Sequence, residues 1–125
     1  MININLKNFP ISYNSPFVLI AGPCVIENES HSLMIAEELK NICVDIDINL
    51  IFKSSFDKAN RSSIKSDRGI KLDDALKIFE KIKTNFNLPL ITDVHNEYQC
   101  NQLNQDSIID IFKYLLFYAV KQIYY

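Results

Sequence analysis

Residues 16–21, PFVLIA, form a continuous apolar run that ends at Gly22 and Pro23, and this run decides the fold. A short apolar run closed by turn residues is typical of a buried strand. Two further runs of this kind follow along the chain, INLIFK at residues 48–53 and PLITDV at residues 89–94. Strands that are apolar throughout, rather than alternating, indicate a parallel sheet with both faces covered.

Two segments with helical spacing separate these runs. The first is predicted to span residues 31–44 with Ser30 as its N-cap, because apolar residues recur there every three or four positions. The second runs from Leu72 to Phe86 and carries two acidic residues in its first turn, where they suit the helix dipole. Strands alternating with helices predict βαβ units, and SIIDI at residues 107–111 is a candidate fourth strand.

The composition narrows the class of protein. A chain of 125 residues that is 48% hydrophobic and 22% charged predicts a single globular domain. The net charge of −2 gives no electrostatic reason to expect a nucleic acid or an anionic membrane as partner. No apolar run approaches the roughly 20 residues that span a bilayer, and no signal peptide is evident, so we expect a cytoplasmic protein.

Polar residues gather where the predicted strands end, which is where parallel α/β folds carry their chemistry. The loop after the second run supplies cations and hydrogen-bond donors that suit a phosphate group. These residues are Lys53, Lys58, Asn60, Arg61, Ser62 and Ser63. A solvated basic loop is the alternative interpretation.

Three other polar residues lie at the ends of the first and third predicted strands. Asp93 and His95 lie two positions apart, so their side chains should face the same way and together orient a hydroxyl or move a proton. A strand-end pair without a chemical role is the alternative. Cys24 follows the first strand, where a lone cysteine is most often a small buried side chain. Its spacing is only a weak indication of a metal ligand, because no second ligand lies near it in the sequence.

The string FKSSFDKANRSS at residues 52–63 closely resembles the signature of the 3-deoxy-D-manno-octulosonate 8-phosphate synthases, also called 2-dehydro-3-deoxyphosphooctonate aldolases. AGPCVIE at 21–27 and ITDVH at 91–95 follow that family's order and spacing. The resemblance implies a (β/α)₈ TIM barrel, of which only the first three to four βα units are present. It also implies a transferase of lipopolysaccharide biosynthesis, which condenses phosphoenolpyruvate with D-arabinose 5-phosphate and releases phosphate.

The resemblance also assigns roles to individual residues. Lys53 and Lys58 would hold phosphoenolpyruvate, and Arg61 and Ser62 would bind the phosphate of the pentose. Asn60, Asp93 and His95 would be the catalytic residues that contact or order the sugar. Cys24 matches the position of a ligand to a divalent metal in the metal-dependent class. A catalytic metal needs about three protein ligands, so we expect this chain alone to bind none.

The last residues break the pattern. Synonymous codons for KYLLFYAVKQIY (113–124), read from their third base, encode IPAFLCRQTDL, which resembles the segment that the family carries next. We therefore predict that residues 1–111 are the amino-terminal part of the barrel and that residues 112–125 are an out-of-frame tail. The alternative is an ordinary divergent terminus.

Two expectations follow for the chain as a whole. It should be inactive by itself and should not form the homo-oligomer of the family. Two other functions remain open. One is the sibling 3-deoxy-heptulosonate-phosphate synthase, which uses erythrose 4-phosphate; the other is a non-catalytic pseudogene remnant.

Overall fold

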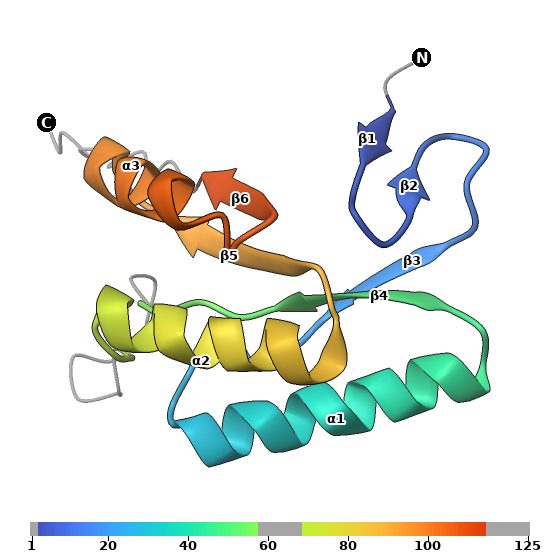
Figure 1. Ribbon diagram of the computed structural model, residues 1–125, viewed down its shortest axis with the longest axis horizontal. Coiled ribbons are helices and arrows are strands. Elements are labelled where there is room, and N and C mark those ends of the chain that lie inside the picture. The colour runs from blue at the N-terminus through green and yellow to red at the C-terminus, as the bar shows by residue number, and fades with distance from the viewer. Residues whose placement is uncertain (1–2, 58–68, 115–125) are drawn as a thin grey trace, which may run out of the picture.

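The computed structural model describes residues 3–57 and 69–114, and its core is a parallel sheet. Its strands are β3 (Val18–Ala21), β4 (Asn49–Lys53), β5 (Leu90–Val94) and β6 (Ile111–Tyr114). They pair in chain order, β3-β4-β5-β6 (Figure 1). The predicted α/β class and parallel sheet are confirmed. Neighbouring parallel strands in chain order are also what the first units of a (β/α)₈ barrel contribute.

Helices follow the first three of these strands and cover the sheet through apolar faces. They are α1 (Glu29–Asp45), α2 (Leu72–Phe86) and α3 (Glu97–Asp106). The strands turn Leu50, Phe52, Leu90 and Val94 toward these helices, where they join one buried cluster. Alternate residues of the same strands therefore face away from the helices, and these include the polar residues at the strand ends.

The N-cap of α1 is Asn28, so the prediction of Ser30 is wrong. Asn28 Oδ1 accepts a hydrogen bond from the backbone N–H of His31 at 2.9 Å. Ser30 is the second residue of the helix, two positions after the cap, and its hydroxyl instead donates to Asn28 Oδ1 at 2.8 Å. Asparagine and serine cap helices about equally well, so local geometry decides between them.

The helix α3 was not predicted, although its start carries a recognisable signal. Asn96 Oδ1 accepts from the backbone N–H of Gln99 at 2.9 Å, and Gln99 Oε1 accepts from the backbone N–H of His95 at 2.8 Å. This reciprocal pattern resembles a capping box. It fixes α3 directly after the carboxyl end of β5.

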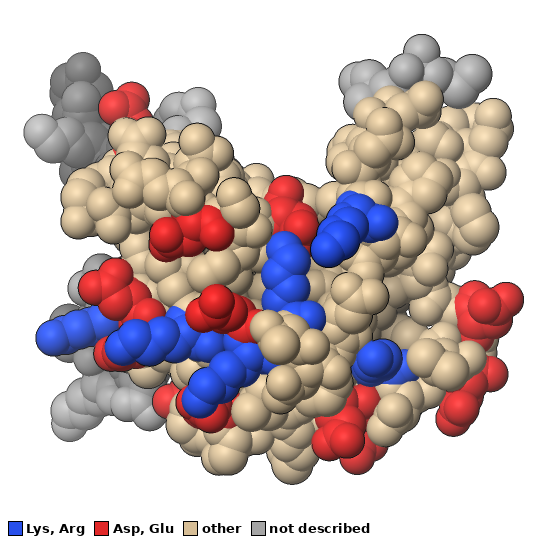
Figure 2. All heavy atoms as spheres, viewed as in Figure 1, with Lys and Arg blue, Asp and Glu red and all other residues tan. Residues whose placement is uncertain are grey.

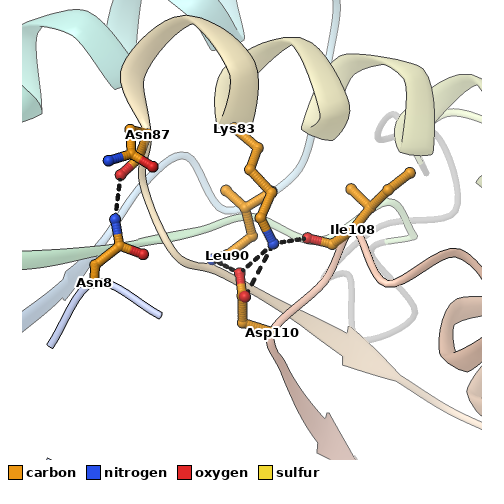
Figure 3. Close-up of polar contacts among 6 residues, drawn as sticks. All are labelled: Asn8, Lys83, Asn87, Leu90, Ile108 and Asp110. Carbon is orange, nitrogen blue, oxygen red and sulfur yellow. Dashed lines mark hydrogen bonds and ion pairs between the residues drawn. The ribbon is translucent and has the colours of Figure 1, made fainter. Parts of the chain in front are cut away.

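The fourth strand lies later than predicted, at Ile111–Tyr114 rather than at residues 107–111. Two features keep the earlier segment out of the sheet. Ser107 adopts a left-handed conformation with φ of 54° after α3, and the Asp110 carboxylate is held by other groups. Figure 3 shows that Asp110 accepts hydrogen bonds from Lys83 Nζ and from the backbone N–H of Leu90, at 2.9 and 2.8 Å.

A small hairpin of β1 (Ile4–Asn5) and β2 (Pro10–Ile11) precedes the sheet. Its turn is tied to the end of α2, because Asn8 Nδ2 donates to the carbonyl of Asn87 at 2.7 Å (Figure 3). The space-filling view is hollowed between this hairpin and the lobe that contains α3 and β6 (Figure 2). In the described part of the chain, no helix is long and apolar enough to cross a membrane.

Candidate functional site

The turn after β3 is joined to the loop after β4 by hydrogen bonds. The Ser54 hydroxyl donates to the Pro23 carbonyl at 2.9 Å, and the Ser55 N–H donates to the Cys24 carbonyl at 3.2 Å. Gly22 makes this approach possible, because a Cβ at that position would lie 1.9 Å from the carbonyl oxygen of Lys53. The AGPC and KSS strings therefore meet at the carboxyl ends of two neighbouring strands.

Lys53, Ser55 and Asp93 form a closed triangle of polar contacts at this end of the sheet. Lys53 Nζ lies 2.9 Å from Asp93 Oδ2 and donates to Ser55 Oγ at 3.0 Å. Ser55 Oγ in turn donates to Asp93 Oδ2. The Lys53 side chain is 24% exposed and that of Asp93 is 7% exposed, so the lysine is partly open to solvent while the carboxylate is buried.

Asp93 is flanked by a second cation from β6. Asp93 and Lys113 are register partners, and Lys113 Nζ lies 4.0 Å from Asp93 Oδ1. Burial alone would raise the pKa of Asp93. Hydrogen bonds from Ser55 and Lys53, together with the charges of Lys53 and Lys113, outweigh that effect and hold the pKa below its usual value. Asp93 is therefore a carboxylate at neutral pH, and among the described residues its Oδ1 has no hydrogen-bond partner.

His95 directly follows β5, near Asp93, and contacts Gln99 and Phe56, which lie outside the Lys53–Ser55–Asp93 triangle. Its Nδ1 lies 3.3 Å from Gln99 Oε1, and its ring meets Phe56 edge to face with the ring centroids 6.5 Å apart. The ring is half-buried, and α3 orients it through Gln99.

Cys24 is exposed, so its interpretation as a small buried side chain is wrong. Among the described residues, no three His, Cys, Asp or Glu side chains cluster closely enough to hold a metal ion. A single thiolate falls short of the roughly three ligands of a catalytic metal site. These residues alone therefore do not fit a divalent metal.

Four predicted site residues, Lys58, Asn60, Arg61 and Ser62, lie outside the described residues. The structure adds Ser55, which the sequence reasoning had not singled out. Ser55 lies two positions after Lys53, the spacing that places two side chains on the same face of an extended segment, so a signal for it existed. Lys113 was likewise missed, because it falls in the segment predicted to be foreign.

The contacts of Lys53 and Asp93 indicate which ligand groups these two residues could bind. A partly exposed lysine suits an anionic carboxylate or phosphate, while a buried carboxylate whose Oδ1 accepts no hydrogen bond from the described residues suits a hydroxyl donor. Both groups come from the ends of adjacent strands, so a small ligand can contact them together. The Ser55 hydroxyl forms hydrogen bonds with both groups.

The chain matches one family model and several relatives that share a single name. The model of the DAHP synthetase I family matches residues 2–113. A 2-dehydro-3-deoxyphosphooctonate aldolase from Rickettsia canadensis is 44% identical over 108 residues, and one from Rickettsia typhi is 47% identical over 108 residues. The relative of the same name from Rickettsia felis is 46% identical over 99 residues.

The matched regions make up most of this chain but a much smaller share of each relative. They include 86% of this chain for the Rickettsia canadensis and Rickettsia typhi relatives and 79% for the Rickettsia felis relative. The same matches cover only 39%, 39% and 36% of those relatives. The chain therefore spans less than two fifths of the length of these curated relatives.

Proposed function

The chain belongs to the DAHP synthetase I family, and from this premise we propose that it supplies the amino-terminal part of a 2-dehydro-3-deoxyphosphooctonate aldolase. The whole enzyme would condense phosphoenolpyruvate with D-arabinose 5-phosphate, with release of inorganic phosphate. Relatives of that name at 44–47% identity support this assignment. The observation that carries it is the Lys53–Ser55–Asp93 triangle at the carboxyl ends of β4 and β5.

The fold supports a barrel that further βα units complete. A (β/α)₈ barrel takes roughly 250 residues and places its active site at the carboxyl ends of its strands. The four strands described here present Lys53, Asp93 and His95 at that end. The relatives extend far beyond the part that this chain covers, which leaves room for the remaining units.

Each described residue has a role that its surroundings suit. Lys53 would bind the negative charge of phosphoenolpyruvate, because its cationic side chain is partly exposed. Asp93 would hold that ammonium group in place through Oδ2 and accept a hydroxyl of the sugar through Oδ1. His95 would line the sugar site from the start of α3. The assignments of Lys58, Asn60, Arg61 and Ser62 stay predictions.

The metal, the oligomer and the location also stay predictions. Cys24 would contribute one ligand to a divalent metal only if further ligands came from outside the described residues. For the chain by itself we continue to expect no bound metal, no homo-oligomer and no turnover. We place the protein in the cytoplasm, which cell fractionation would test.

A fusion protein tests the proposed activity. Residues 1–111 would be joined in frame to the carboxyl-terminal segment of the Rickettsia typhi relative, and phosphate release would be measured with phosphoenolpyruvate plus either sugar phosphate. We expect turnover with D-arabinose 5-phosphate and little with erythrose 4-phosphate. The reverse preference would favour the sibling synthase, and a folded fusion without turnover would favour a non-catalytic remnant.

Substitutions in the fusion connect the activity to the site. Lys53→Met should lower kcat/KM on the order of a hundredfold, because it removes a charge that contacts the substrate. Lys81→Met is the matched control, since Lys81 is half-exposed on α2 and pairs with Glu29 instead. Equal activity of the two variants would remove Lys53 from the site.

A further inference from the structure

Asp93 presents a buried acceptor that its described neighbours leave without a donor. The residue is 5% exposed, and its Oδ1 accepts no hydrogen bond from any residue that the structure describes. Its Oδ2 is already used, because Lys53 Nζ lies 2.9 Å away and Ser55 also donates to it. A buried carboxylate oxygen without a donor is costly, so Oδ1 favours a ligand that can donate a hydrogen bond to it.

Lys113 lies beside this oxygen but is not hydrogen-bonded to it. It is the register partner of Asp93 on the neighbouring strand β6, and its Nζ lies 4.0 Å from Asp93 Oδ1. That distance allows charge attraction but is too long for a hydrogen bond. The Lys113 side chain is 60% exposed, so it can rotate toward solvent and let a ligand reach Oδ1.

The charges of these three residues do not balance. Two ammonium groups, those of Lys53 and Lys113, flank the single carboxylate of Asp93. The Lys53–Asp93–Lys113 cluster therefore has an excess of positive charge and attracts a small anion. Phosphate and carboxylate oxygens are the usual partners of such ammonium groups in proteins.

The excess of positive charge and the unpaired Oδ1 together define the ligand. It needs anionic oxygens for the two lysines and also an O–H group for Asp93, since an ionised carboxylate can only accept hydrogen bonds. Hydrogen phosphate and dihydrogen phosphate meet both conditions at neutral pH. Sulfate has the same tetrahedral shape but carries no O–H at this pH, so the carboxylate would repel the sulfate oxygen placed beside it.

We propose that the 125-residue chain binds inorganic phosphate in the Lys53–Asp93–Lys113 cluster and distinguishes it from sulfate through the O–H group that Asp93 accepts. This phosphate site goes beyond the proposed function, because all three residues belong to this chain and none of the missing barrel units is needed. Lys113 lies in the predicted out-of-frame tail, outside the three strings that resemble the synthase family. The site is therefore a property of this chain that the resemblance does not assign.

Isothermal titration calorimetry on the 125-residue chain tests the site. Inorganic phosphate and sulfate would be titrated at neutral pH and at the same ionic strength, because salt screens the attraction between charges. We expect phosphate to bind at least about tenfold more tightly than sulfate, since a hydrogen bond to a charged group is gained and a repulsion is avoided. Equal affinities would overturn the role of Asp93 Oδ1, and a lack of phosphate binding would overturn the site.

Three substitutions assign the individual contributions. Asp93→Asn should abolish the preference for phosphate, because an amide can donate to sulfate as well as accept from phosphate. Lys113→Met should weaken the binding of both anions several-fold and by a similar factor, because it removes a charge but leaves the acceptor. Lys77→Met is the matched control and should bind as the unchanged chain does, since Lys77 is exposed on α2 and pairs with Asp74. A preference that persists in Asp93→Asn, or an unchanged affinity in Lys113→Met, would remove that residue from the site.

The ratio of the two affinities remains informative even if a variant is less stable. Partial unfolding lowers both affinities by the same factor, and circular dichroism on each variant checks that the helices remain. Phosphate release by the fusion protein, which contains residues 1–111 and so lacks Lys113, separates this site from the proposed activity. Phosphate binding by the chain together with an inactive fusion would uphold the site and reject the activity. An active fusion without phosphate binding by the chain would reject the site alone.

Discussion

Asp93 shows how a single residue can couple the chemistry of this site to its stability. It is a buried carboxylate between two ammonium groups, one from each neighbouring strand, and Ser55 donates to the same oxygen that Lys53 contacts. Removing either partner from a buried charge is costly, because the charge is left uncompensated. The same residues are therefore expected to appear in measurements of activity and of unfolding.

The pH dependence of stability tests this arrangement. Because the pKa of Asp93 is lower in the folded state, its contribution is complete above the unfolded value of about 3.9 and is lost as the pH falls through the folded value. We expect the free energy of unfolding to decrease as the pH drops below about 4, and this decrease should be smaller in Asp93→Asn. Urea titrations at several pH values measure it. Asp45→Asn, at an exposed position of α1, should keep the acid dependence. An unchanged slope in Asp93→Asn would contradict the arrangement.

Gly22 is the second residue whose identity is fixed by its surroundings. Its Cβ position lies 1.9 Å from the Lys53 carbonyl oxygen, a backbone atom that cannot move aside independently. Gly22→Ala should therefore force the β3 turn away from β4 and destabilise the fold by about 1–3 kcal/mol or more. Chemical denaturation measures the change. Glu27→Ala, exposed in the same connection, should have an effect within about 0.5 kcal/mol. A neutral Gly22→Ala would show that the two loops are not in contact.

At the scale of elements, the apolar pattern predicted the positions of β3, β4 and β5 and of the helices α1 and α2 within a few residues. The predicted burial holds for β4 and β5, whereas no residue of β3 is buried and Ile20 is 53% exposed, so the interpretation of residues 16–21 as a buried strand is wrong. The helix α3 was missed, since it buries Leu103 alone and depends on the cap at Asn96. The position of β6 was missed for another reason: Asp110 is held by Lys83 on α2, a contact between residues 27 positions apart that no local pattern reveals.

The cap of α1 can be assigned by experiment. Asn28→Ala should destabilise the chain by about 1 kcal/mol, since it removes the acceptor for the His31 N–H. Ser30→Ala should cost less, because the Ser30 hydroxyl bonds only to the Asn28 side chain in the described contacts. Thermal unfolding of both variants compares them directly. A larger loss in Ser30→Ala would restore the original prediction.

The contact between Lys83 and Asp110 should fix the start of β6. Lys83 Nζ also donates to the Ile108 carbonyl at 2.7 Å, so it holds the connection before the strand at two points (Figure 3). Asp110→Ala should lower the protection of β6 amides from hydrogen exchange and cost about 1.5–3 kcal/mol. The double variant with Lys83→Met should show coupling rather than additive losses. Additive losses would mean that the two residues act independently.

For the whole molecule, the sequence predicted which strand ends bring polar side chains together better than it predicted which side chains make contact there. Lys53 and Asp93 meet as the strand-end rule implies, because parallel strands bring their carboxyl ends to one edge. Ser55 could have been predicted from its spacing, but the contact between Asp93 and Lys113 required knowledge of which strand lies beside β5. Residues 58–68, with four of the predicted ligands, lie outside the described part and keep their roles as predictions.

The reading frame after residue 111 is the property of the whole chain with the largest consequence. The strand β6 continues through Tyr114, across the predicted boundary, and the family match ends at residue 113. Pairing of a strand uses backbone groups, so it accepts many side chains and does not by itself decide the frame. We predict that one base change near the codon for Phe112 restores IPAFLCRQTDL and the units that follow it. Sequencing the gene from the codon for Ile109 onward measures this directly.

The two products should then differ in function. The 125-residue chain should release no phosphate from phosphoenolpyruvate and D-arabinose 5-phosphate, because an incomplete barrel lacks the groups that its missing units would supply. The product in the restored frame should turn over, and Lys53→Met should abolish most of that activity. Turnover by the 125-residue chain would refute the need for further units. A downstream frame that stays interrupted would instead identify the chain as the remnant of an enzyme whose first strands still fold as they did in the active protein.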